Sequence, residues 1–510
     1  MKDLNEQHKI ERNLKLIAKS SFIVFIGLLI SKVLTYVYRI TIARSFGPEI
    51  YGLFSVAIMV LGWFMLFASF GFSEGLIRYV SFYIGKKQYS KIRYLFLIST
   101  TITLIFGIIS TLLLFLLSEF ISIRIFHNPN LTIFLRIFSF LIPIYLVSNI
   151  FLSILQAYEK INWYSFIINI VQNFVRFIAL VIFILIGFKI NSVIYSYFLG
   201  FVAMLLVAYF VCRYQTKEIF QKQPLEKKIK KQTAKEFFSY SWPLIFTMAI
   251  SEIFYWTDSF FIGFFKGVTE VGYYNAAIPI ALLLAFVPEI FIKLFFPIIT
   301  KEYSQKRLNV VKQISQQVGK WVLVLNLPIF LIILLFPGAI INLLFGPQYL
   351  VASNALRILS VGAFVSSLVW ISYSLLSMAG KTKIILKSFL AAAVLNILLN
   401  LILIPPYGIN GAAIATTLSK IVFSFILIVQ IKNNLSIIPF RRKIFGIFIL
   451  SLIPLSLVLL IRKFIEVNLL NLVLTSGLFF LLYFLLIFVT NSLDKNDFMI
   501  LKSINKKIFT

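Results

Sequence analysis

The sequence predicts an all-α polytopic membrane protein with fourteen transmembrane helices: two parallel six-helix lobes, related by a pseudo-two-fold axis along the membrane normal, and two C-terminal helices. Three observations predict this class. The 510 residues are 60% hydrophobic and 13% charged, with a mean hydropathy of +0.96. Apolar runs long enough to cross a bilayer recur along the whole chain, and segments half a chain apart resemble each other. A soluble domain could not bury this much apolar surface, whereas an apolar run of about 20 residues spans a membrane as a helix.

Hydropathy predicts a helical span in each of fourteen apolar runs. Their centres lie near residues 31, 62, 106, 145, 175, 202, 252, 285, 330, 367, 394, 420, 452 and 479. The first run, 20–42, is too long for the core of a signal peptide and lacks a small-residue cleavage site, so we expect a retained span. Spans ten to twelve are the most diluted by Ser, Gly and Asn.

Lysine and arginine are concentrated in alternate connections. The N-terminus, the long connection 213–237, and the connections after spans two, eight, ten and twelve are basic, whereas 345–353 and 405–411 carry no charge. The positive-inside rule then places both termini in the cytoplasm of a protein of the cell membrane, which requires an even number of spans. The net charge of +30 is expected to orient the chain and to meet anionic lipid, not to bind nucleic acid.

Three pairs of segments repeat at an offset of about 220 residues. They are 30–57 with 250–277, 135–140 with 356–361, and 190–194 with 409–414. Because each half has an even number of spans, both halves share one orientation, which is typical of transporters whose substrate path lies between the repeats. The predicted organisation is an amphipathic cytoplasmic N-terminus (1–19), an N-lobe (20–212), a basic linker (213–237), a C-lobe (238–431), two added spans (432–490) and a cytoplasmic tail (491–510).

The segments ARSFGPEIYGLFSVA (43–57), FGFSEGLIRYVSFYIGKKQ (70–88) and SYSWPLIFTMAIS (239–251) resemble the polysaccharide transporter family of the MOP flippase superfamily, which exports lipid-linked oligosaccharides. The resemblance covers nearly the whole chain. It implies a MATE-like fold with two lobes facing a central cavity, lined largely by spans one, two, seven and eight. It also implies alternating access without ATP hydrolysis, and it carries over no fixed list of site residues.

The face of span one that carries Lys32, Tyr36 and Arg39 is the first candidate for substrate binding. These residues stand at i, i+4 and i+7, so they lie on one side of a helix. The repeat places Glu252 at the position of Lys32 in the other half. A Lys32–Glu252 ion pair would lower the cost of both charges and close the lobes. Alternatively, Lys32 and Arg39 bind the pyrophosphate of a substrate, with Glu252 as modulator or proton site. A Lys32–Glu252 ion pair that opens when the substrate enters would satisfy both hypotheses.

Further polar residues lie within or beside the spans. Arg176 and Lys420 are deep cations that either line the cavity or contact a neighbouring span. Asp258 is a weaker candidate for ion or proton coupling. Glu74 and Arg78 stand one turn apart, so an intrahelical pair is expected, with a headgroup contact as the alternative. Arg78 is also a candidate for lining the substrate cavity, and Glu74 is a candidate for coupling or gating.

The deep cations outnumber the deep acids, which together with the resemblance favours a flippase for a polyprenyl-pyrophosphate-linked oligosaccharide. Anionic lipids and glycan-assembly proteins are the other expected partners. A cation-coupled multidrug exporter or, less favoured, a membrane oligosaccharide polymerase or ligase are the alternatives. No phosphate-binding loop, nucleophile elbow or metal-ligand cluster is visible, and the single cysteine, Cys212, excludes an intrachain disulfide. We therefore expect no catalytic residue, metal or cofactor; coupling to an ion gradient or to the membrane potential stays open.

Overall fold

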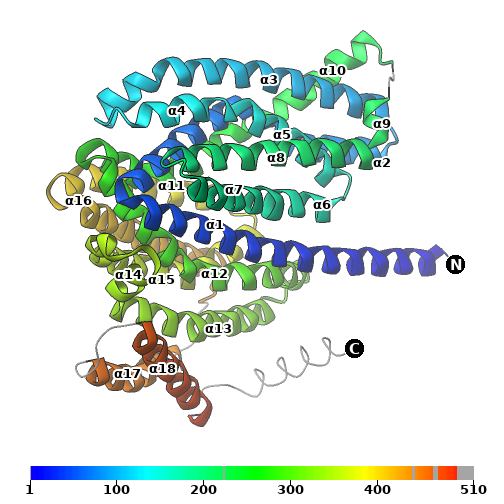
Figure 1. Cartoon of the computed structure of the whole chain (residues 1–510). Coiled ribbons are helices and arrows are strands. Elements are labelled where there is room, and N and C mark those ends of the chain that lie inside the picture. The colour runs from blue at the N-terminus through cyan, green and yellow to red at the C-terminus, as the bar shows by residue number, and fades with distance from the viewer. Residues whose placement is uncertain (1, 222–223, 439–442, 463–468, 491–510) are drawn as a thin grey trace. The chain divides into compact units, whose positions relative to one another are not determined.

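A computed structural model of the chain describes residues 2–221, 224–438, 443–462 and 469–490 (Figure 1). Every secondary-structure element in these ranges is a helix, which confirms the all-α prediction. The predicted tail, 491–510, lies outside the described residues. Two compact units divide the chain, Met1–Gly272 and Tyr273–Thr510.

The first unit begins with a long broken helix and continues through shorter ones. Its elements are α1 (Lys2–Ser69), α2 (Phe72–Gly85), α3 (Tyr89–Phe120), the π-helix η1 (Ile121–Ile125), α4 (Leu131–Ser139), α5 (Leu141–Ala157), α6 (Ile161–Ser165), the π-helix η2 (Phe166–Val171), α7 (Gln172–Ile186), α8 (Asn191–Gln215), α9 (Lys217–Phe220), α10 (Lys227–Ser241) and α11 (Leu244–Lys266). The helix α12 (Val268–Ser304) starts in this unit and ends in the second.

The second unit continues with long apolar helices. They are α13 (Leu308–Leu335), α14 (Pro337–Phe345), the 3₁₀-helix η3 (Pro347–Ala352), α15 (Ser353–Met378), α16 (Thr382–Leu435), α17 (Lys443–Arg462) and α18 (Leu469–Val489). Valine, isoleucine, leucine and phenylalanine of α12, α13, α15 and α16 form its buried core.

Two of the long helices are each broken once by a glycine. Gly47 interrupts α1 with φ 79° and ψ 179°, and Gly408 interrupts α16 with φ 54° and ψ −132°. Proline lies within two residues of each break, and glycine is the residue that adopts positive φ at no steric cost. The predicted span centres 31 and 62 therefore lie on either side of Gly47, and the centres 394 and 420 on either side of Gly408.

Ten helices in the described ranges are long and apolar enough to cross a membrane, or eleven if the bent pair α4 and α5 forms one span. The apolar part of α17, Gly446–Ile461, is shorter than these. The chain is therefore a multi-pass membrane protein. The count of fourteen spans, the symmetry of two lobes and the cytoplasmic termini stay predictions.

The connection after α8 is partly helical and packs against α2 and α3 within the first unit. Phe72 of α2 contacts the rings of Phe237 and Phe238 in α10 at centroid distances of 5.3 and 5.4 Å. The guanidinium of Arg93 in α3 donates hydrogen bonds to the carbonyls of Ile219 (3.1 Å) and Gln221 (2.7 Å). Part of the predicted solvated linker is thus held against α2 and α3.

In the first unit, the turn of α1 packs closely against the turn between α11 and α12. A Cβ atom on Gly52 would lie 2.8 Å from the carbonyl carbon of Val268, and one on Gly272 would lie 3.0 Å from the carbonyl carbon of Pro48. Both contacts involve backbone, so only glycine permits this approach. The two contacts exchange under a shift of 220 residues, which is the offset of the repeat in the sequence.

Candidate transport site

The residues predicted to form a cationic face lie on the first segment of α1, and the break at Gly47 gives one of them a partner. Lys32, Tyr36 and Arg39 are all half-buried on the first segment of α1. The guanidinium of Arg39 hydrogen-bonds the side chain of Tyr51, which is fully buried just beyond the break. The chain reversal at Gly47 therefore lets one part of α1 solvate a cation on the other.

Arg176 of α7 is buried against the same segment of α1. Its side chain is 8% exposed, and its Nη2 donates a hydrogen bond of 2.9 Å to Thr35 Oγ1. The guanidinium lies 4.8 Å from the centroid of the Tyr38 ring and 5.8 Å from that of Tyr197 in α8. Gly200 makes room, since a Cβ there would lie 2.8 Å from the Cβ of Arg176. The Nε atom of Arg176 is buried without a hydrogen-bond partner among the described residues.

An asparagine of α7 extends this polar contact along α1. Asn173 donates to Ser31 Oγ (3.0 Å) and accepts from Thr35 Oγ1 (3.1 Å). It also donates to the carbonyl of Asn169 (2.9 Å), the residue of η2 one turn earlier. A π-helical turn in an otherwise regular helix frequently marks a functional site, and here it directly precedes Asn173.

The two arginines are stabilised by neutral groups. In the described part of the chain, no carboxylate pairs with the guanidinium of Arg39 or of Arg176; hydroxyl oxygens and tyrosine rings surround them instead. The two charges are also close enough to repel each other. Buried cations in a membrane protein are costly, so an arrangement without counter-ions suits a site that receives an anion.

Glu252 of α11 is engaged within its own helix. Its Oε1 accepts a hydrogen bond of 2.9 Å from the indole of Trp256, and a Cβ on Gly62 would lie 3.1 Å from the same atom. The carboxylate thus has a neutral partner one turn along, and the ion pair of Glu252 with Lys32 stays a prediction. Asp258, further along α11, is buried at 8% exposure.

Arg78 of α2 has a different partner from the predicted one. Its guanidinium lies 4.1 Å from the centroid of the Tyr240 ring, and Tyr79 Oη donates to the carbonyl of Glu236 (3.1 Å). The predicted ion pair with Glu74 is not present among the described contacts. Arg78 therefore helps to attach α10 to α2. Desolvation raises the pKa of the Glu74 carboxyl above its ordinary value.

The second unit holds one predicted cation and one that the sequence did not single out. Lys420 of α16 is half-buried. Lys320 of α13 is only 2% exposed. Further along the same helix, Asn326 donates a hydrogen bond of 2.8 Å to the carbonyl of Leu284 in α12. Lys320 stands at the start of an apolar run, where a lysine is usually exposed at the membrane interface. The sequence therefore provides no reason to expect a buried lysine there.

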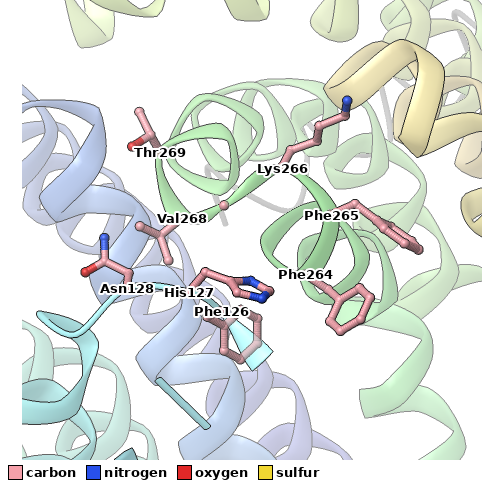
Figure 2. A pocket seen from close by; sticks show the side chains of 9 residues that line it. Phe126, His127, Asn128, Phe264, Phe265, Lys266, Val268 and Thr269 are labelled. Carbon is pink, nitrogen blue, oxygen red and sulfur yellow. The ribbon is translucent and has the colours of Figure 1, made fainter. Parts of the chain in front are cut away.

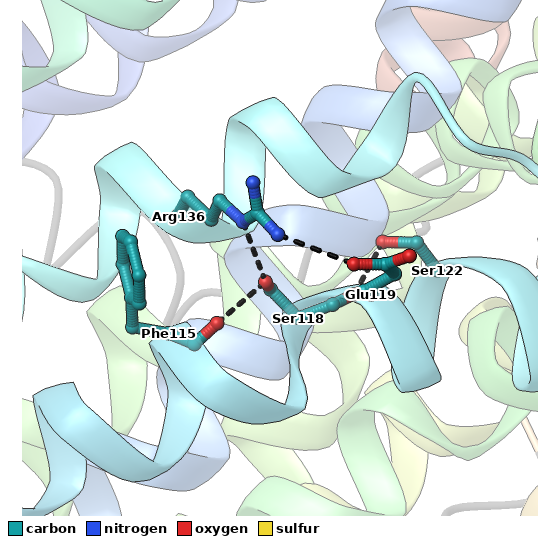
Figure 3. A network of polar contacts seen from close by, with 5 residues as sticks. All are labelled: Phe115, Ser118, Glu119, Ser122 and Arg136. Atoms are coloured by element: carbon teal, nitrogen blue, oxygen red, sulfur yellow. Dashed lines mark hydrogen bonds and ion pairs between the residues drawn. The ribbon is translucent and has the colours of Figure 1, made fainter.

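The end of α3 is joined to α4 by a surface network (Figure 3). Arg136 forms an ion pair of 3.3 Å with Glu119 and donates from Nε to Ser118 Oγ at 3.3 Å. Its guanidinium also lies 5.5 Å from the centroid of the Phe115 ring. Both charged groups are solvent-exposed, so this network contributes little to stability and fixes the approach of the two helices.

Titratable side chains do not gather into a metal site in the residues that the structure describes. No group of three or more His, Cys, Asp or Glu there has the geometry to hold a metal ion. Cys212 is buried and forms no disulfide, and its side chain contacts Thr216 Oγ1 at 3.3 Å.

Comparison with known proteins gives one consistent result. A family model for polysaccharide biosynthesis proteins matches residues 17–303, more than half of the chain, and a MatE model matches residues 243–402. A membrane protein of Methanocaldococcus jannaschii, described as uncharacterized, is 26% identical over 481 residues, covering 89% of this chain and 92% of its own length. The putative O-antigen transporter of Shigella flexneri is 23% identical and covers 76% and 90%.

The fold also matches solved structures. Lipid II flippase MurJ in an inward closed conformation superimposes with a TM-score of 0.73 at 19% identity, covering 92% of this chain and 99% of that one. The residues matched by the family model include both sides of the break in α1 and the whole arginine site. The chain therefore belongs to the polysaccharide biosynthesis protein family, that is, to the polysaccharide transporter family of the MOP flippase superfamily, as its sequence predicted.

Proposed function

We propose that the protein is a flippase that moves a polyprenyl-(pyro)phosphate-linked oligosaccharide from the cytoplasmic to the outer leaflet of the cell membrane by alternating access. The observation that carries this proposal is the pair Arg39 and Arg176, two guanidinium groups held by hydroxyls and aromatic rings in a member of a glycan-transporter family. Relatives named as an O-antigen transporter and a lipid II flippase support the same class of substrate.

The chemistry of the substrate explains why cations would be retained here. The polyprenyl tail can stay in lipid, but the phosphates and the sugar must be kept away from hydrocarbon. Arginine presents two parallel donors that match a phosphate, and its charge is permanent. An inside-negative potential favours outward movement of an anion by about 2.3 kcal/mol per charge per 100 mV.

In this proposal Arg39, Arg176 and Lys32 bind the phosphates, and Tyr36 and Asn173 orient them. Glu252, bonded to Trp256, acts as the modulating acid: released from the indole, it would pair with Lys32 once the anion has left. Lys420 and Asp258 stay candidates for lining the path and for coupling, respectively. No catalytic residue or cofactor is assigned.

The test is glycan export in cells that depend on this protein. Arg39→Gln and Arg176→Gln are expected to lower surface glycan at least tenfold and to raise lipid-linked precursor inside the cell. Lys189→Gln removes an exposed cation on the α7–α8 connection and is the matched control. If both arginine variants export at the wild-type level with equal expression, the cationic site is not used for the substrate.

A cation-coupled multidrug exporter is the second candidate, favoured by the MatE match at residues 243–402 and by the buried acid Asp258 within it. It predicts drug resistance on expression, which Asp258→Asn or Glu252→Gln would abolish. Sensitivity identical to that of cells without the protein would eliminate this candidate.

A further inference from the structure

A pocket of about 360 Å³ lies in the first unit and shares no lining residue with the arginine site. One wall is the turn after η1, residues 126–128, and the other is the end of α11 and the start of α12, residues 264–269. Figure 2 shows side chains from both walls facing one another. The pocket lies at the same end of the helices as the break at Gly47, because Gly52 of α1 contacts Val268 there.

The aromatic wall of this pocket is built from rings that pack on one another. Phe264 is 41% exposed and stacks on Phe260 of the same helix, with a centroid distance of 6.3 Å and an interplanar angle of 15°. Phe260 in turn makes an edge contact of 6.0 Å with the buried ring of Phe126. A Cβ on Gly263 would lie 2.8 Å from that ring, so this glycine lets the two walls meet.

Polar groups of several kinds surround the exposed ring. His127 lies 6.4 Å from Phe264 between ring centroids, and its backbone adopts φ 52°, which is uncommon for a residue other than glycine. Asn128, Lys266 and Thr269 add an amide, an ammonium and a hydroxyl group to the lining. Asn128 is held by a hydrogen bond of 3.4 Å from its Nδ2 to Glu49.

We propose that this pocket binds one saccharide unit of the translocated glycan. The C–H groups on one face of a pyranose ring carry partial positive charge and fit the negative face of Phe264. The hydroxyls need both donors and acceptors, which the imidazole, amide and hydroxyl supply. A largely apolar pocket would suit a tail or a drug, whereas the exposed ring and the mixed polar groups here match the apolar face and the hydroxyls of a sugar.

This inference rests on the proposed function for its biological meaning. In the proposed orientation the pocket lies at the outer face, so it would hold the sugar as it leaves the transport path. The binding itself can be measured without transport, which keeps the two claims separate.

The experiment uses the full-length protein in nanodiscs and two kinds of probe, both without a lipid tail. The probes are methyl glycosides of glucose, galactose, N-acetylglucosamine and glucuronic acid, and oligosaccharides released from the host's own lipid-linked pool. Binding is followed by saturation-transfer NMR and titration. Phe264→Ala and His127→Ala are the test variants. Phe188→Ala is the matched control, because Phe188 is also 41% exposed but lies on the α7–α8 connection, outside this pocket.

At least one probe is expected to bind the wild type and Phe188→Ala alike, and to bind Phe264→Ala at least tenfold more weakly. Lys266→Gln, which changes only an exposed side chain, should also weaken binding and guards against a folding defect in Phe264→Ala. If no probe binds the wild type, or if Phe264→Ala and Lys266→Gln bind as the wild type does, the pocket is not a saccharide site. If the pocket does not bind saccharide but the protein still transports the glycan, the proposed function is supported and the pocket assignment is wrong. If the pocket binds saccharide but the protein does not transport the glycan, the pocket assignment is supported and the proposed function is wrong.

Discussion

Replacing Gly52 with alanine tests the close approach of α1 to the turn between α11 and α12. The added Cβ would lie 2.8 Å from the carbonyl carbon of Val268 and 3.0 Å from the amide nitrogen of Gly272. The carbonyl oxygen of Val268 would lie closer still, and carbon atoms in ordinary contact are about 3.5 to 4.0 Å apart, so the two backbones must separate by about 1 Å or more. Neither backbone can move aside by changing a rotamer.

The expected size of the effect follows from two opposing terms. Overpacking of a tight contact costs about 1–3 kcal/mol. Alanine in place of glycine within a helix returns about 0.5–1 kcal/mol. Gly52→Ala should therefore be destabilised by up to about 2.5 kcal/mol. Gly477→Ala, in the interior of α18 where no described atom lies within 4 Å of the added Cβ, should be stabilised by about 0.5–1 kcal/mol.

Thermal unfolding in detergent, followed by circular dichroism, measures the sign of both effects. The transition temperature should fall for Gly52→Ala and rise for Gly477→Ala. Gly272→Ala should resemble Gly52→Ala, and the double variant should lose less than the sum, because one added methyl group already separates the two segments. A transition temperature for Gly52→Ala at or above that of the wild type would refute the close contact.

The remaining predictions concern the arginine site and the linker. Arg176→Met should leave the free energy of unfolding within about 1 kcal/mol of the wild type, because the loss of the charged hydrogen bond and the cation–π contacts is offset by removal of a buried charge. Glycan export should nevertheless fall at least tenfold. Strong destabilisation in thermal unfolding would show that Arg176 has a structural role instead. Gly75→Ala places a Cβ 2.9 Å from the Phe237 ring, so α10 should pack less tightly on α2. Trypsin should then cleave the 213–237 segment faster than in the wild type, and an unchanged cleavage rate would contradict this contact. Arg93→Gln should lower stability by about 1 kcal/mol through loss of its two carbonyl contacts, measured by the same unfolding assay, with Lys189→Gln unchanged as control.

Hydropathy placed the helices well because a lipid environment imposes one simple requirement on the backbone. Each apolar run must satisfy its own hydrogen bonds, and a helix does so from local sequence alone. The repeat offset likewise pairs Gly52 with Gly272 in the sequence, and the fold brings these two glycines together. The membership of the family followed from local motifs in the same way.

Side-chain contacts that depend on how neighbouring helices pack could not be predicted from the sequence. Arg78 was expected to pair with Glu74 one turn away, but the docking of α10 offers it the ring of Tyr240. Lys320 is buried only because neighbouring helices cover its side of α13. In both cases the deciding quantity is which face of a helix meets which neighbour, and hydropathy carries no information on that.

The most direct test of the account is translocation by the purified protein. Proteoliposomes carry a fluorescent polyprenyl-pyrophosphate oligosaccharide in the inner leaflet, and an impermeant quencher reports its arrival outside. The account predicts that the wild type moves the lipid many times faster than empty vesicles do, and that Arg39→Gln with Arg176→Gln reduces the rate to that of empty vesicles. A wild-type rate equal to that of empty vesicles, or an unchanged rate in the double variant, would contradict it.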